Sequence, residues 1–409
     1  MLNSPTPATA EAIASPALQL LWTEAGNECS ALWRSERGAP PPKRVMLADD
    51  TMSADTAYRL ACEGTGLLWR GDFHNARQLL QALARRADNV PARKRKKAAI
   101  ELETTISAAD AFHRHRLAQS QRARMLGMLL VPFNADYSVP LRRAPDVKQA
   151  CEQAWGPADE STGTSVASLR ELLGITSAHE WRRVGVEIAA LGEAPLNRIH
   201  PHYGVFSPVR GEYIQLVATA HLPKPPTGQS GIVAFDIGTG TGVLAAVLAR
   251  RGIQKIIATD QDPRALACAR ENLAQLKVDT EVQLLQADLF PEGRASLVVC
   301  NPPWLPARPS SPIERAVYDE GGRMLQGFLQ GLTAHLAPKG EGWLILSNLA
   351  EHLGLRSRAD LLAAFERNGL RVISRIDAKP LHTKAFDGGD ALHDARSREV
   401  TSLWRLAAV

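Results

Sequence analysis

Hydrophobic positions in the second half of the chain form short apolar runs, and stretches with helical spacing separate most of them. Seven runs have the length of strands: 232–236, 255–260, 282–288, 295–300, 342–348, 370–376 and 400–406. Helices are predicted at 243–251, 263–276, 323–336 and 358–368. This alternation predicts an α/β fold with a doubly wound, Rossmann-like, seven-stranded sheet. A long polar stretch and no helix joins the last two runs, so these strands could pair antiparallel at one edge.

The first half of the chain has a different pattern. Apolar residues from Ala54 to Ala87 recur mostly at three- and four-residue steps, which predicts a helix. Further helices are expected at 93–124, 147–155, 165–173 and 178–191. Residues 1–50 are rich in Pro and Ala, and Ala39–Pro42 forms a stiff break. The pattern therefore predicts a Pro/Ala-rich segment (1–50), a mostly helical recognition domain (51–195) and the α/β domain (200–409).

Charge is unevenly distributed along the chain. The 409 residues carry a net charge of +5, and region 83–124 alone holds 11 Lys/Arg against 4 Asp/Glu. Such a cluster can attract phosphate backbones or an acidic protein. A solvated helix face is an equally good interpretation of the same charges.

The cysteine pattern and the start of the chain indicate a cellular location. The five cysteines are odd in number, scattered, and lack the spacing of metal ligands. We therefore expect no metal site and a reducing cytoplasm. Residues 1–14 lack the features of a signal peptide, and no apolar run approaches 18 residues, so a soluble protein without membrane contact is predicted.

A glycine-rich turn lies between the first predicted strand of the α/β domain and its first helix. Gly238, Gly240 and Gly242 allow positive φ and close approach of a ligand to the backbone, and the following helix offers N–H groups. Asp260 ends the next strand, where a carboxylate can accept hydrogen bonds from ribose hydroxyls. Asp288 ends the third strand and could meet an adenine amino group. The dinucleotide fingerprint does not fit, because its third glycine position is occupied by Val243.

The sequence Asn301-Pro302-Pro303-Trp304 follows the fourth predicted strand. An Asn side-chain carbonyl and a proline backbone carbonyl can accept both hydrogens of a planar nitrogen and hold it in line with an electrophilic methyl group. The prolines fix the turn, and Trp304 can stack on a planar acceptor. This chemistry needs positioning and no strong base.

At these residues the sequence resembles the class I S-adenosylmethionine-dependent methyltransferases, and among them the small-domain branch with an Asn/Asp-Pro-Pro-aromatic motif. The resemblance covers about residues 200–409. It implies S-adenosylmethionine bound over the glycine turn, a catalytic Asn301-Pro302-Pro303-Trp304, and no metal. The cofactor-binding residues that it implies are Asp236, Gly238, Thr239, Gly240, Gly242, Asp260, Gln261, Asp288, Leu289 and Asn301.

Two loops are similar to those of glutamine methyltransferases that act on release factors and ribosomal proteins. These loops are Phe206–Glu212, with its Pro-Val-Arg sequence, and Tyr318–Gly322, with its Asp-Glu-Gly-Gly turn. They favour protein glutamine as the methyl acceptor. The sequence departs from those enzymes in Trp304, where Tyr is usual, and in its longer, more basic N-terminal domain. An amino group of an RNA or DNA base, a small-molecule acceptor and a catalytically silent binding protein remain alternatives.

Three further features have alternative interpretations. The polar loop 381–390 is either a substrate lid or an ordinary hairpin loop. His113 and His115 lie two residues apart, so a helix would point them to different sides, and they fit a basic surface better than a metal site. Cys300 is predicted to be a buried strand residue.

Overall fold

The computed structural model describes residues 18–88, 106–225, 231–309, 313–380 and 392–409. The chain divides into two compact units. Unit 1 comprises residues 1–88, 124–152 and 157–172, and unit 2 comprises residues 89–123, 153–156 and 173–409. These units do not follow the predicted boundaries near 50 and 195, because strands before residue 50 and residues 51–88 belong to one unit.

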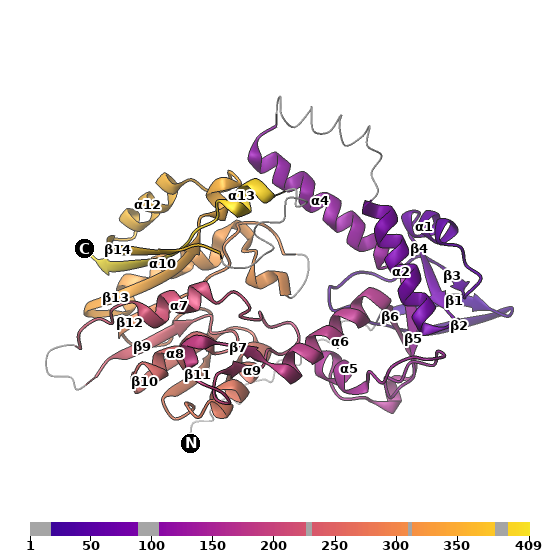
Figure 1. Ribbon diagram of the computed structural model, residues 1–409, viewed down its shortest axis with the longest axis horizontal. Coiled ribbons are helices and arrows are strands. Elements are labelled where there is room, and N and C mark those ends of the chain that lie inside the picture. The colour runs from indigo at the N-terminus through magenta and orange to yellow at the C-terminus, as the bar shows by residue number, and fades with distance from the viewer. Residues whose placement is uncertain (1–17, 89–105, 226–230, 310–312, 381–391) are drawn as a thin grey trace, which may run out of the picture. The chain divides into compact units, whose positions relative to one another are not determined.

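Unit 1 is built around a six-stranded sheet with the order β1-β2-β6-β5-β4-β3 (Figure 1). Its strands are β1 (Gln19–Glu24), β2 (Asn27–Trp33), β3 (Arg44–Ala48), β4 (Thr65–Trp69), β5 (Leu129–Phe133) and β6 (Ser165–Ser168). Its helices are α1 (Ala54–Cys62), α2 (Phe73–Asp88), most of α5 (Lys148–Trp155) and the short η1 (Glu160–Thr162). Among the described helices, α5 and two others continue from one unit into the other along the chain: α4 (Ala108–Leu126) and α6 (Leu169–Val184).

The sheet of unit 1 corrects the predicted local structure of the first half. The described residues between 51 and 195 contain helices, but they also contain strands that the pattern does not predict. Thr65–Trp69 is a strand inside the predicted helix 54–87, and all five of its residues are buried, so it lacks the alternation that reveals a strand. Ser165–Ser168 is likewise a strand where a helix was predicted. The predicted break at Ala39–Pro42 is confirmed, since these residues form no regular element.

The β1–β2 hairpin lies wholly within the Pro/Ala-rich segment. Its strands pair antiparallel, and the turn residues Ala25 and Gly26 both have positive φ (51° and 81°). Such a turn matches the twist of a two-stranded hairpin. The usual Asn-Gly or Asp-Gly signal is absent here, which explains why the pattern did not reveal the hairpin.

Unit 2 contains the predicted α/β domain. Its main strands are β9 (Val233–Ile237), β10 (Lys255–Asp260), β11 (Val282–Gln286), β12 (Ala295–Cys300), β13 (Leu336–Ser347), β14 (Leu370–Ala378) and β15 (Thr401–Ala408). Its helices are α7 (Glu212–Thr219), α8 (Val243–Arg250), α9 (Pro263–Gln275), α10 (Arg323–His335), α11 (Leu349–His352), α12 (Arg358–Arg367) and α13 (His393–Ser397). Smaller elements are β7 (Val186–Glu187), β8 (Arg198–Ile199), η2 (Ala189–Leu191), η3 (Ile313–Ala316) and η4 (Glu320–Gly322).

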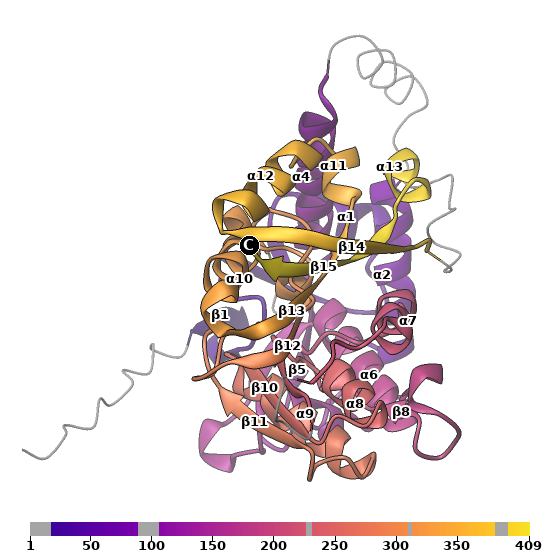
Figure 2. The ribbon, with the colours of Figure 1, turned by 90° about the vertical axis from the view of Figure 1, so that its left-hand side faces the viewer.

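The seven-stranded sheet confirms the predicted fold class. Its order is β11-β10-β9-β12-β13-β15-β14, and only β15 runs antiparallel to its neighbours. Figure 2 shows β14 and β15 side by side, the predicted antiparallel pair. The chain order reverses between β9 and β12, and ligands bind beyond the carboxyl ends of strands at such a switch point.

Helices lie on both faces of the sheet (Figure 1), and an apolar cluster packs between the helices and the sheet on each face. Ala234 packs in the cluster that contains α7, α8 and α9, and its neighbour Phe235 packs in the cluster with α10 and α12. Consecutive residues of a strand point to opposite faces, so β9 is buried on both sides. This fixes the position of the turn that follows β9.

In the described parts of the chain, no helix is long and apolar enough to cross a membrane.

Candidate active site

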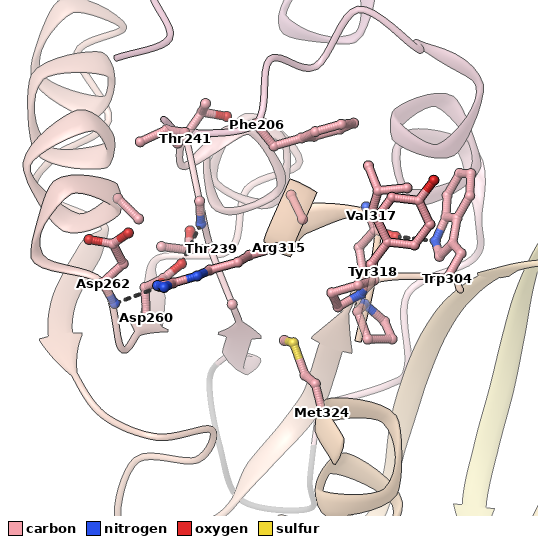
Figure 3. A pocket seen from close by; sticks show the side chains of 18 of the residues that line it. Phe206, Thr239, Thr241, Asp260, Asp262, Trp304, Arg315, Val317, Tyr318 and Met324 are labelled. Carbon is pink, nitrogen blue, oxygen red and sulfur yellow. Dashed lines mark hydrogen bonds between the residues drawn. The ribbon is translucent and has the colours of Figure 1, made fainter. Parts of the chain in front are cut away.

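A cavity of about 650 Å³ lies in unit 2 and is lined by residues that follow β9, β10, β11 and β12. Its volume is in the range typical of ligand sites. In Figure 3, Asp260 and Asp262 lie on one side of this cavity, and Trp304, Val317 and Tyr318 lie on the other. Most predicted site residues line it: Gly238, Thr239, Gly240, Asp260, Gln261, Asp288, Leu289, Asn301, Pro302, Pro303 and Trp304.

The glycine turn has the predicted backbone conformation. Gly238, Gly240 and Gly242 have φ of 73°, 55° and 80°, values that favour glycine. A Cβ on Gly240 would meet no atom within 4 Å, so there is room for a ligand against this part of the backbone. The N–H groups of Gly238 and Thr239 both donate to the Thr259 carbonyl, at 2.9 and 2.8 Å. The turn itself therefore offers close approach of a ligand to the backbone, and these two N–H groups are not among its free donors.

Two predicted cofactor ligands do not line the cavity. Asp236 is 1% exposed and accepts hydrogen bonds from the Thr239 hydroxyl (2.7 Å) and the Ala245 N–H (3.1 Å), so it holds the turn from below. Its burial raises its pKa to about 6. Gly242 begins α8, and a Cβ there would approach the Cβ of Ala269 to 3.2 Å. Both residues support the conformation of the glycine turn and do not face the cavity.

Asp260 links the glycine turn to the start of α9. Its carboxylate accepts from the Gly240 N–H and the Asp262 N–H, each at 3.0 Å. Burial raises the pKa of this carboxyl group. Each carboxylate oxygen can accept a further hydrogen bond, so these contacts are compatible with ribose binding.

Asp288 has a more open environment than Asp260. Its side chain is 60% exposed and pairs with Arg323 at 3.1 Å. Arg323 also donates to the side chain of Gln261 at 3.4 Å. Arg323, the first residue of α10, therefore contacts residues that follow both β10 and β11.

The Asn301–Trp304 motif has an internal hydrogen bond that the sequence did not suggest. The indole N–H of Trp304 donates to the side-chain oxygen of Asn301 at 2.9 Å. Because the indole nitrogen is only a donor, this contact defines which end of the Asn301 amide is the oxygen. That oxygen retains capacity for a second hydrogen bond, which a substrate N–H can supply. Trp304 therefore orients Asn301 in addition to lining the cavity.

The loop Phe206–Glu212 contributes Arg210 to the same cavity. The Arg210 guanidinium lies 5.9 Å from the centre of the Trp304 ring and pairs with Glu399 at 3.2 Å. The second loop, Tyr318–Gly322, contributes Tyr318 to the lining. Asp319 accepts from the Met324 N–H at 2.8 Å, so this part of the Asp-Glu-Gly-Gly turn serves to begin α10.

Several lining residues belong to no sequence motif. Glu399, Arg315 and Met324 line the cavity but lie outside any motif. No signal in the sequence indicates Glu399, whose place in the cavity wall follows from the pairing of β15 with β13 in the sheet. Cys300 is fully buried, as predicted, and burial raises its pKa. The predicted lid 381–390 lies outside the described residues. In the part of the chain that the structure covers, no cluster of metal-binding side chains occurs.

This sheet order, with a glycine turn after its first strand and Asn-Pro-Pro-Trp after its fourth, is that of the class I methyltransferases. A family model described as "Methyltransferase small domain" matches residues 197–367. This region of the chain is therefore similar to the methyltransferase small-domain family, as the sequence predicted. The predicted resemblance to S-adenosylmethionine-dependent methyltransferases is thereby confirmed for residues 197–367.

Similar proteins include enzymes that methylate parts of the translation apparatus. A release factor glutamine methyltransferase of Cereibacter sphaeroides is 33% identical over 177 residues, which make up 40% of this chain and 58% of the relative. A ribosomal protein L11 methyltransferase of Symbiobacterium thermophilum is 39% identical over 71 residues, or 17% of this chain and 23% of the relative. The chain thus spans less than two thirds of the length of either. A solved methyltransferase structure from Pyrococcus furiosus is 19% identical, with a TM-score of 0.37 over 57% of this chain and 98% of that chain.

Proposed function

We propose that the protein is an S-adenosylmethionine-dependent N-methyltransferase that acts on a macromolecule, and that its acceptor is the side-chain amide of a protein glutamine. The Trp304–Asn301 hydrogen bond at the cavity is the observation that carries this proposal. It leaves an oriented carbonyl oxygen at the carboxyl end of β12, the group needed to receive an amide N–H.

The residues of the cavity divide into two sets. Gly240 and Asp260 would hold the cofactor, since the first leaves room at the backbone and the second presents a carboxylate. S-adenosylmethionine supplies the methyl group when bound. Asn301 and the Pro302 carbonyl would hold the acceptor nitrogen by its two hydrogens, so that its lone pair faces the methyl group. Positioning of this kind can lower the activation free energy by about 7–11 kcal/mol.

Protein glutamine is favoured over a nucleic-acid base for two reasons. The release factor and L11 methyltransferases above are named for protein acceptors. In addition, Arg116, part of the basic region 83–124, lies against the loop that lines the cavity and pairs with Glu314 at 3.5 Å. Its positive charge is therefore already paired within the protein and is less available to a phosphate backbone. Arg93–Lys97, the densest part of that region, lies outside the described residues.

Labelled S-adenosylmethionine and an extract of cells lacking the enzyme test the proposal. We expect label that protease removes and ribonuclease does not, and no label with the Asn301→Ala variant. Label removed by ribonuclease, and binding that weakens steeply with salt, would instead identify a nucleic-acid acceptor. Equal labelling by wild type and Asn301→Ala would contradict the assigned role of Asn301.

A further inference from the structure

A buried glutamate forms part of the cavity wall. Glu399 precedes β15, lines the cavity and is 1% exposed. Charged side chains are seldom buried so completely unless they are paired. The contacts of its two carboxylate oxygens therefore indicate what the residue does.

The two oxygens of Glu399 have different environments. Oε1 accepts a hydrogen bond from Arg210 at 3.2 Å and another from the Ser347 hydroxyl at 2.8 Å. Oε2 is shielded from solvent and has no hydrogen-bond partner among the residues that the structure describes. A buried acceptor without a donor lowers the stability of the folded protein. Because this oxygen belongs to a residue of the cavity wall, a bound ligand can supply the missing donor.

The position of Glu399 places it on the acceptor side of the cavity. Its partner Arg210 lies 5.9 Å from the Trp304 ring centre, and Trp304 holds Asn301. Side-chain contacts thus run from Glu399 to the group expected to bind the reacting nitrogen. Asp260, the expected ribose ligand, lies across the cavity from Trp304 in Figure 3.

We propose that Glu399 is a specificity-determining residue whose Oε2 accepts a hydrogen bond from a neutral N–H of the acceptor protein that lies outside the methylated amide group. This inference rests on the proposed function. A neutral donor fits better than a cation, because Arg210 already compensates the carboxylate charge. Since Oε2 is covered, the carboxylate or the Arg210 side chain rotates as the acceptor enters.

Glu399→Gln is the variant that tests this. Its amide oxygen can keep the contacts with Arg210 and Ser347, while an NH₂ group replaces Oε2 and repels an N–H donor. The acceptor is the protein recovered from the labelling assay. We expect its KM to rise about ten- to a hundredfold. kcat and the Kd for S-adenosylhomocysteine should change little.

Glu341→Gln is the matched control. Glu341 is also buried on this sheet and pairs with Arg405 at 2.8 Å, but it does not line the cavity. Its substitution should leave the acceptor KM unchanged.

Each other outcome rejects a distinct claim. An unchanged acceptor KM in Glu399→Gln overturns the role of Oε2 and leaves the proposed function intact. A KM that rises equally in Glu341→Gln, or a weaker S-adenosylhomocysteine affinity in Glu399→Gln, also overturns it, because either result indicates a structural effect. A wild-type enzyme that methylates no protein overturns the proposed function and this inference with it.

Discussion

The Asn301 amide is oriented by one neighbour, and this arrangement can be tested at the scale of single atoms. Trp304→Phe keeps an aromatic ring and removes the indole N–H that donates to Asn301. We expect kcat to fall about tenfold, since one hydrogen bond is lost and the amide can rotate. Asn301→Ala should lower kcat by about a hundredfold or more, because the acceptor nitrogen loses its positioning group. Single-turnover kinetics measure both, and an unaffected Trp304→Phe enzyme would contradict the orienting role.

Asp260 and Asp288 end neighbouring strands but are expected to differ in their effect on cofactor affinity. Asp260 is part of the wall beside the glycine turn, whereas Asp288 is largely exposed and paired with Arg323. In calorimetric titrations, Asp260→Ala should bind S-adenosylhomocysteine with an affinity at least about tenfold lower than wild type. The reason is that a charge-assisted hydrogen bond contributes more binding free energy in a buried site. Asp288→Ala should have a smaller effect. Equal losses of affinity in the two variants would contradict the expectation that the buried carboxylate contributes more to cofactor binding than the exposed one.

Asp236 predicts a pH dependence of stability. Its pKa is raised to about 6 by burial, from about 4 in an unfolded chain. A group with a raised folded pKa contributes stability below its unfolded pKa, and this contribution is lost as the pH rises to about 6. The free energy of unfolding of wild type, minus that of Asp236→Asn, should therefore fall by up to about 3 kcal/mol between pH 4 and pH 7. Denaturant titrations without cofactor measure this difference, and a difference that rises with pH would contradict the assigned burial effect.

At the scale of elements, α4 supports the active-site loop. Arg116 on this helix donates to the Arg308 carbonyl at 2.7 Å and lies 3.7 Å from the ring centre of Tyr318, which lines the cavity. Phe112, one turn earlier, is fully buried in a cluster with Leu305. The sequence suggested a basic surface over His113–Arg116, and the structure corrects this for Arg116, which faces the loop.

Arg116→Ala should therefore raise the acceptor KM by about tenfold, since the Tyr318 wall loses a cation–π contact and a hydrogen bond. Arg114 is an exposed neighbour on the same helix and provides the control. Steady-state kinetics of Arg114→Ala should match wild type. Similar losses in both variants, with a steep salt dependence, would instead indicate that α4 binds a phosphate backbone.

How far the elements could be predicted depended on how their side chains are buried. β12 and β10 were predicted with their observed bounds, because each is a short apolar run between clear turn or helix signals. β4 was missed, because Leu67 and Leu68 are both fully buried and extend the leucine spacing of the flanking helices. Glu399 could not be recognised either, since its importance arises from contacts with Arg210 and Ser347, each more than 50 positions away.

At the scale of the whole molecule, the two halves of the chain differ in how much their sequence reveals. Unit 2 carries motifs whose positions at the strand ends follow from the sheet order, so most predicted site residues line one cavity. Unit 1 carries no chemical motif, and its six-stranded sheet depends on pairings between distant segments, such as β2 with β6. Periodicity within a short window does not contain that information.

Identification of the methylated atom tests the central claim most directly. Acceptor protein labelled by the purified enzyme would be digested completely and its products separated by chromatography and mass spectrometry. We expect a single labelled amino acid, glutamine carrying one methyl group on its side-chain nitrogen, and its absence with Asn301→Ala. Label on a nucleobase, or on a protein carboxylate or lysine, would contradict it.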